Sequence, residues 1–334
     1  MLGLAWSAVF CFGLVSLVTF ILPLLRQLFY KEQNFKAKYG GDGSWALVTG
    51  ASSGIGLAFS QKLAAQGINV VMVALDDEHF QRSFSAIQKD FPKIKFRRVP
   101  TNLGVPGYVS EITKATEDLK VRMVFCNAGY LLPGFFTGPD ASSDRQLANL
   151  ECNLVSAVKI SHHFIGRMLS VGCLSDACHF VAQMEPLPGG RRGLVEFTSS
   201  SAAFLPNPLA VLYASTKAFM TNFAAGLAGE YQGMGIDILA VHPSPIASRF
   251  ASDTDMLGPV KASMRIAAAP SVIADDVFAS AGRCVIRDQG AVTLLLKLLC
   301  KAIDFNLLAQ MFTTFSAMSP EFKARRSKLF EKRE

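Results

Sequence analysis

Short apolar runs alternate with amphipathic stretches along most of the chain, and this alternation predicts strands separated by helices. The apolar runs have the length of buried strands, whereas the amphipathic stretches have helical spacing. Repeated strand–helix units with apolar strands indicate an α/β protein: a Rossmann-type, doubly wound parallel sheet with helices on both faces. The predicted strands are 45–48, 68–74, 95–99, 121–126, 194–198 and 236–241, and the predicted helices are 57–66, 108–119, 145–169 and 210–231.

The N-terminal stretch breaks this alternation, because no charged side chain lies between Leu2 and Leu25. A helix of this length can cross a hydrocarbon core about 30 Å thick. A cleaved signal peptide is the alternative, but the run is longer than such peptides carry, and it lacks a basic n-region and a convincing cleavage site. We therefore expect a single membrane-spanning helix. Basic residues follow it and, by the positive-inside rule, place the rest of the chain on the cytosolic side: Arg26, Lys31, Lys36 and Lys38.

The C-terminal stretch is also apolar, but charged residues interrupt it. Residues 292–315 are dense in Leu and Phe yet contain Lys297, Lys301 and Asp304, so we do not expect a second span. An amphipathic hairpin that lies on the bilayer or over the substrate pocket, and a plain core helix, both stay open. The last dozen residues are basic and are either solvated or in contact with anionic head groups.

Together these patterns divide the chain into four segments. We expect a membrane anchor at 1–30, a linker at 31–43, a Rossmann-fold domain at 44–290, and an apolar helical extension with a basic tail at 291–334. Half of the 334 residues are apolar, enough for one α/β core with appendages, and the net charge of +7 is partly local to the C-terminus. Nothing in the sequence resembles a nucleic-acid-binding module.

The seven cysteines are odd in number and scattered. Cys173 and the pair Cys178–His179 come nearest to a ligand cluster, but no second pair follows them. We therefore expect ordinary thiols, kept reduced on the cytosolic side, and no metal site.

Tyr213 and Lys217 are the first candidates for catalysis. Four residues apart on a predicted helix, their side chains project from the same face. An ammonium near a phenol favours phenolate and lowers the phenol's pKa towards neutrality, where acid–base catalysis works best. Such pairs also occur by chance on helix surfaces, so the pair needs support from other motifs.

A glycine-rich turn supplies that support. Residues 49–56, Thr-Gly-Ala-Ser-Ser-Gly-Ile-Gly, lie between a predicted strand and a predicted helix, with another strand after the helix. In this context glycines let the backbone approach a pyrophosphate, and the helix N-terminus offers N–H donors. We expect dinucleotide binding here, by Gly50, Ser52, Ser53, Gly54, Ile55 and Gly56.

With these motifs in order, residues 44–287 resemble the classical short-chain dehydrogenases/reductases. Asn127-Ala128-Gly129 is similar to the family's motif after the fourth strand, and residues 243–248 to its Pro-Gly-Pro-Val-x-Thr stretch beside the nicotinamide. Ser200 precedes Tyr213 by the family's thirteen residues. The resemblance implies a catalytic set of Asn153, Ser200, Tyr213 and Lys217. It also implies cofactor contacts from Leu75, Asp76, Asn102, Leu103, Asn127, Ala128, Gly129, Tyr213, Lys217, Pro243, Ile246 and Ser248.

The implied roles follow family chemistry. Tyr213 would be the acid in reduction, Lys217 would lower its pKa and hold the cofactor ribose, Ser200 would polarise the carbonyl, and Asn153 would hold a water. The cofactor would carry the hydride.

Three departures from the family pattern affect cofactor binding. After the second strand, Leu75 and Asp76 stand where the family discriminates NAD from NADP, and no basic residue is offered there to a 2′-phosphate. Asn102 replaces the usual aspartate near the adenine, although its amide oxygen can still accept a bond. Ser244 replaces a glycine, and residues 170–193 are longer than usual.

The anchor and the apolar extension resemble the membrane-bound branch of the family, which includes very-long-chain 3-oxoacyl-CoA reductases and 17β-hydroxysteroid dehydrogenases. We expect reduction of a long-chain 3-oxoacyl-CoA with NADPH at the endoplasmic reticulum, with NAD(H) left open. The alternatives are a sterol or steroid dehydrogenase, a 3-ketosphinganine-type reductase, and a non-catalytic lipid-binding scaffold. A substrate loop is expected at 249–265, and the resemblance is compatible with a homodimer.

Overall fold

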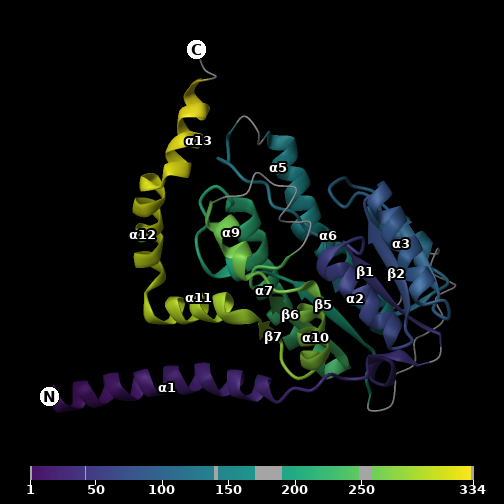
Figure 1. Cartoon of the computed structure of the whole chain (residues 1–334). Coiled ribbons are helices and arrows are strands. Elements are labelled where there is room, and N and C mark those ends of the chain that lie inside the picture. The colour runs from purple at the N-terminus through teal and green to yellow at the C-terminus, as the bar shows by residue number, and fades with distance from the viewer. Residues whose placement is uncertain (1, 42, 139–141, 170–189, 248–257, 332–334) are drawn as a thin grey trace.

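A parallel sheet forms the centre of the computed structural model, which describes residues 2–41, 43–138, 142–169, 190–247 and 258–331 (Figure 1). Within these residues the sheet has seven strands in the order β3-β2-β1-β4-β5-β6-β7. The strands are β1 (Ser44–Thr49), β2 (Asn69–Ala74), β3 (Phe96–Pro100), β4 (Lys120–Cys126), β5 (Gly193–Thr198), β6 (Ile236–His242) and β7 (Ile286–Asp288).

Helices cover both faces of this sheet, as its apolar strands require. One face packs against α4 (Tyr108–Thr116), α6 (Ser156–Leu169) and α7 (Val211–Tyr231). The other packs against α2 (Gly54–Ala65), α3 (Glu78–Asp90) and α10 (Pro270–Ser280). The predicted doubly wound α/β fold is therefore confirmed.

The strand order reverses between β1 and β4, which are neighbours although two strands separate them in sequence. In open α/β sheets ligands bind outside the carboxyl ends of the strands at such a point. The glycine-rich turn after β1 and the segment 127–129 after β4 both lie there.

The long helix expected at 145–169 is present, but it is not regular. It consists of α5 (Ser143–Leu150), a π-helical segment η2 (Glu151–Val155) and α6. Sequence analysis did not identify α3, α10 or the short strand β7.

The N-terminal helix α1 (Leu2–Leu28) extends away from the sheet (Figure 1). Its stretch from Val9 to Leu28 is apolar and long enough to cross a membrane, and apart from Gln27 near its end it is not buried. It is the apolar N-terminal helix that the sequence predicted.

The segment expected to be a linker, residues 31–43, makes contacts with the main domain. Phe35 and Tyr39 are fully buried, and Phe35 stacks on Phe278 of α10 with 4.0 Å between ring centroids. The Tyr39 hydroxyl donates to Asp237 at 2.6 Å. These contacts fix where the chain leaves α1 and enters β1.

The C-terminal extension consists of α11 (Gly290–Ala302), α12 (Phe305–Met318) and α13 (Pro320–Glu331). Figure 1 shows α11 alongside α1, α12 running across that direction, and α13 continuing past the short helix α9 (Gly258–Ser263). Phe322 of α13 reaches the main domain, where its ring centroid lies 4.9 Å from that of Phe135.

Candidate active site

Two glycines of the turn after β1 leave no room for a side chain. Gly50 has a φ of +65°, a conformation that L residues avoid. A Cβ at Gly56 would lie 2.3 Å from the carbonyl oxygen of Gly50. Helix α2 begins at Gly54, directly after Ser53, so the amide donors of its first turn adjoin this turn. Glycine backbone beside a helix N-terminus fits the pyrophosphate of a dinucleotide.

Thr49 joins this turn to the segment after β4. Its hydroxyl oxygen accepts hydrogen bonds from the backbone N–H groups of Asn127 and Ala128, both at 3.0 Å. The Asn127 side-chain amide in turn donates to the Thr49 carbonyl oxygen at 3.1 Å. These bonds hold the ends of β1 and β4 together, where the cofactor residues were predicted.

Asn153 lies in the π-helical segment η2 and is almost fully buried. Its amide donates to the carbonyl oxygen of Tyr130 at 2.8 Å, and its oxygen accepts from the Tyr130 N–H at 2.9 Å. Such π segments are frequent at functional sites. A Cβ at Gly129 would meet Asn153 Oδ1 at 3.2 Å and Lys217 Nζ at 3.5 Å, so both side chains border Gly129.

Helix α7 carries Tyr213 and Lys217 to the same site. Lys217 is 4% exposed; its Nζ donates to the Thr198 carbonyl oxygen at 2.7 Å and lies 5.7 Å from the centroid of the Tyr213 ring. Ser200 caps the short helix η4 (Ser201–Phe204) by accepting from Ala202 N–H, and it hydrogen-bonds the Tyr213 phenol. The four predicted catalytic residues therefore converge at the carboxyl ends of the strands.

The electrostatics of the pair differ from the sequence-based expectation. Desolvation raises the pKa of the Tyr213 phenol above its ordinary value, and the hydrogen bond with Ser200 offsets this only in part. Desolvation also lowers the pKa of Lys217 to about 8, against the favourable charges of Cys152 and Glu196. In the protein alone, burial therefore outweighs the lowering of the phenol's pKa that was expected from Lys217.

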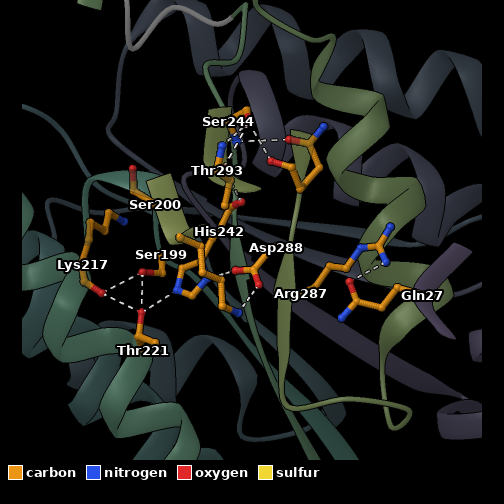
Figure 2. A network of polar contacts seen from close by, with 12 residues as sticks. Gln27, Ser199, Ser200, Lys217, Thr221, His242, Ser244, Arg287, Asp288 and Thr293 are labelled. Carbon is orange, nitrogen blue, oxygen red and sulfur yellow. Dashed lines mark hydrogen bonds and ion pairs between the residues drawn. The ribbon is translucent and has the colours of Figure 1, made fainter. Parts of the chain in front are cut away.

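A chain of buried polar groups runs behind Lys217 (Figure 2). Thr221 Oγ1 lies 3.1 Å from the Lys217 carbonyl oxygen and 2.8 Å from His242 Nε2. His242 Nδ1 is 2.7 Å from one oxygen of Asp288, and the other oxygen pairs with Lys297 of α11. Burial alone would raise the pKa of Asp288, but hydrogen bonds from His242 and Lys297 hold it below its usual value. The network ties the C-terminal extension to the catalytic helix.

Ser244 stands where the family pattern has glycine, and the same network accommodates it (Figure 2). Its hydroxyl donates to the Gln289 carbonyl oxygen at 2.7 Å and lies 3.1 Å from Thr293 Oγ1. A Cβ at Gly290 would lie 2.4 Å from Ser244 Oγ, so glycine there makes room for the hydroxyl. The departure adds a contact between the segment after β6 and α11.

Other predicted cofactor residues differ in their surroundings. Leu75 is 56% exposed at the end of β2, whereas Leu103 is buried in the core. The Asn102 side-chain oxygen accepts from Gly104 N–H at 2.9 Å. Pro243 accepts a hydrogen bond from Ser201 N–H, Ile246 is nearly buried, and Ser248 lies outside the described residues.

Contrary to the sequence-based expectation, a cation lies at the turn after β2. Arg98 of β3 forms an ion pair with Asp76, and its guanidinium carbon lies 4.9 Å from the centroid of the Phe80 ring. Arg98 Nε is buried and has no hydrogen-bond partner among the described residues. Sequence reasoning missed Arg98 because only the pairing of β2 with β3 brings it to this turn.

Comparison with known proteins identifies the family to which the chain belongs. A family model described as short chain dehydrogenase matches residues 44–256. The chain therefore belongs to the short chain dehydrogenase family, as the resemblance predicted.

Individual relatives show which members of the family the chain is similar to. The chain is 30% identical to a very-long-chain 3-oxoacyl-CoA reductase-like protein of Arabidopsis thaliana, over 63% of this chain and 62% of that protein. It is 31% identical to the 17-beta-hydroxysteroid dehydrogenase type 3 of Mus musculus, over 62% and 61% of the two chains. A solved structure of a 7beta-hydroxysteroid dehydrogenase superimposes with a TM-score of 0.67 at 25% identity, covering 81% of this chain and 95% of that one. The match thus spans about three fifths of the curated relatives.

Proposed function

We propose that the protein is a membrane-anchored, NAD(P)(H)-dependent oxidoreductase that reduces a ketone on a lipid-type substrate, a long-chain 3-oxoacyl-CoA. The observation that carries this proposal is the convergence of Asn153, Ser200, Tyr213 and Lys217 beside the glycine-rich turn. The relatives named very-long-chain 3-oxoacyl-CoA reductase support the substrate class.

The side chains supply the acid–base chemistry. When bound, a nicotinamide cofactor supplies the hydride, which turns the substrate carbonyl into an alkoxide. Tyr213 donates a proton to that oxygen. Ser200, which hydrogen-bonds Tyr213 in the protein alone, turns its single hydroxyl hydrogen to the substrate oxygen when substrate is bound. The Lys217 ammonium holds the cofactor ribose and favours phenolate once the proton has left Tyr213. Asn153 holds the water from which the proton is replaced.

An apolar wall beside Tyr213 supports a lipid-type substrate. Leu131, Leu209 and Ala210 form a buried cluster against which Phe135, Tyr213 and Phe322 pack. Phe322 comes from α13, so the C-terminal extension contributes to the surroundings of the catalytic tyrosine. Such a wall suits an acyl chain or a sterol ring.

A steroid dehydrogenase is the second candidate. The named 17-beta-hydroxysteroid dehydrogenases and the superimposed 7beta-hydroxysteroid dehydrogenase favour it. The apolar cluster beside Tyr213 suits both an acyl chain and a steroid, so the substrate assay is needed to distinguish the two candidate functions.

NADPH use with a detergent-solubilised protein and a long-chain 3-oxoacyl-CoA tests the proposal. We expect cofactor consumption that depends on the acyl-CoA, with Tyr213→Phe as the blank. Consumption with a steroid ketone but not with the acyl-CoA would replace the first candidate by the second. No substrate-dependent consumption with either ketone, with NADPH or NADH, would overturn the proposed activity.

NADPH is the cofactor that we favour, with NADH as the alternative. The Arg98 guanidinium lies at the turn where family members discriminate the ribose substituent, and it neutralises Asp76. The terminal nitrogens of a guanidinium can bind a phosphate through charge-assisted hydrogen bonds, and one of those of Arg98 already reaches Asp76 at this turn.

Two substitutions at this turn should change cofactor preference in opposite directions. Arg98→Gln removes the cation and leaves Asp76 to repel a 2′-phosphate, so we expect the NADPH to NADH ratio of kcat/KM to fall by about 10-fold, the loss of one charge-assisted contact. Asp76→Asn removes the competing carboxylate and should raise that ratio. Equal changes with both cofactors would show that Arg98 only supports the fold.

The proposed location is a membrane. Helix α1 serves as a single-pass anchor, and the family's lipid-metabolising branch favours the endoplasmic reticulum with the catalytic residues on the cytosolic side. A homodimer is also proposed, on family analogy.

A further inference from the structure

Helix α12 presents an exposed apolar stripe. Leu307, Phe315 and Met318 are 52%, 60% and 62% exposed, and Met311 lies half-buried between them. Their spacing places the four side chains on one face of the helix. No charged residue occurs between Phe305 and Met318. A contiguous apolar surface of this kind marks an interaction site.

The stripe is a fixed surface rather than a frayed segment. Leu308, on the neighbouring face of α12, is only 1% exposed, so the helix is held against the rest of the chain on that side. Asp304 caps the helix by accepting from the backbone N–H of Asn306 at 2.9 Å. The exposed side chains therefore keep one common direction.

Contacts at the end of α11 place α12 next to the membrane anchor. Lys301 Nζ donates to the Ser16 carbonyl oxygen of α1 at 2.9 Å and lies 3.4 Å from Thr19 Oγ1. It also lies 5.7 Å from the centroid of the Phe20 ring. Helix α12 starts four residues later and runs across the direction of α1 (Figure 1). It thus meets α1 at the level of Ser16 to Phe20.

That level is the middle of the apolar window Val9–Leu28, the candidate span, although the uncharged stretch of α1 already begins at Leu2. Any placement of α1 that puts this window into a bilayer brings α12 to the bilayer as well. An ammonium at the bilayer centre costs about 2.5–3.5 kcal/mol, so Lys301 favours a level nearer the surface. A span of about 20 residues that begins near Leu2 ends close to Ile21 and leaves Ser16 to Phe20 within about 10 Å of its cytosolic end. Helix α12 then lies about 5–10 Å below the head groups, from where a lysine side chain still reaches them.

We propose that α12 lies in the bilayer interface, with the stripe Leu307–Met311–Phe315–Met318 among the acyl chains. The inference rests on the proposed membrane location of α1. Helix α13 follows α12 after one residue and brings Phe322 against the cluster that contains Tyr213. The helix in the membrane is therefore continuous with the helix that borders the site, and an apolar substrate passes between bilayer and site along α12 and α13.

Tryptophan fluorescence of the full chain in bilayers tests this placement. The two native tryptophans are Trp6 in α1 and Trp45 in β1. Phe315→Trp in a Trp6→Phe, Trp45→Phe background reports on α12, and Met234→Trp in the same background is the matched control, since Met234 is 53% exposed on the short helix η5 (Gln232–Met234). Trp45→Phe alone leaves Trp6 to report on α1.

We expect brominated acyl chains to quench the Phe315→Trp and Trp6 emissions by at least about half, and to leave the Met234→Trp emission unchanged. Quenching of Trp6 without quenching of Phe315→Trp would overturn the placement of α12 while the anchor stands. Quenching of neither would overturn both proposals. Blue-shifted but unquenched emission from Phe315→Trp would mean that a second copy of the chain, not lipid, covers the stripe, and would also overturn the placement.

Discussion

Tyr213→Phe should lower turnover by at least about 10³-fold and leave cofactor binding within about 2-fold. The substitution removes only the phenolic hydroxyl, which is the proposed proton donor to the developing alkoxide and the group that Ser200 hydrogen-bonds. General acid catalysis contributes about 10²–10⁴-fold. The ring itself packs against the apolar cluster and stays in place, so the fold and the glycine-rich turn should be unaffected.

Single-turnover kinetics and cofactor titration by fluorescence separate the two effects. Ser215→Ala is a suitable control because Ser215 lies on the same turn of α7 but is exposed. Turnover by Tyr213→Phe near that of the unmodified protein would remove Tyr213 from the mechanism and would favour a scaffold that kept the fold.

Six of the seven strands were predictable along the sequence because most of them are largely apolar runs that alternate with helical patterns. The strand β7 was not, since it has only three residues and its sequence, Ile-Arg-Asp, carries two charges. Those charges are used in pairing: Asp288 with His242 and Lys297, and Arg287 with Asp276. A short polar strand at the edge of a sheet has no apolar pattern to reveal it.

Some residues of the candidate site could be predicted from the sequence, and others could not. Tyr213, Lys217, Ser200 and Asn153 could be chosen because their spacing and order match a family pattern. Arg98 and the network behind Lys217 could not, because each depends on contacts between residues far apart in sequence. His242 offered no motif, yet the structure buries it between Thr221 and Asp288. Residue spacing carries information about one helix or turn, whereas these groups meet only through the sheet.

The π-helical segment at Asn153 shows a related limit. The sequence predicts one helix across 145–169, and nothing in it marks the extra residue at η2. The segment is held by tertiary contacts, because the Asn153 side chain bonds both backbone groups of Tyr130. Asn153 could be proposed as a site residue from the sequence, but the π-helical distortion of the backbone that carries it could not.

Lys217→Met should abolish function without weakening the fold. Turnover should fall by at least about 10³-fold, because the ammonium that favours phenolate and holds the ribose is lost. Cofactor affinity should fall as well, which distinguishes this variant from Tyr213→Phe. The free energy of unfolding at pH 7 should be at least that of the unmodified protein, because burial penalises the charged lysine and lowers its pKa from 10.5 to about 8.

The lowered pKa of Lys217 also predicts how the stability of the protein changes with pH. A cation whose pKa is lowered by folding costs stability while it is charged, and the cost is relieved as pH rises from about 8 towards 10.5. The free energy of unfolding of the unmodified protein, relative to that of Lys217→Met, should therefore increase from pH 7 to pH 9. Urea unfolding of both proteins at the two pH values measures this difference. Over the same window the kcat/KM for reduction should fall as the ammonium deprotonates. If Lys217→Met instead unfolds at much lower urea at pH 7, the hydrogen bond from Lys217 to Thr198 serves mainly to hold β5 against α7, and the loss of turnover is a consequence of the damaged fold.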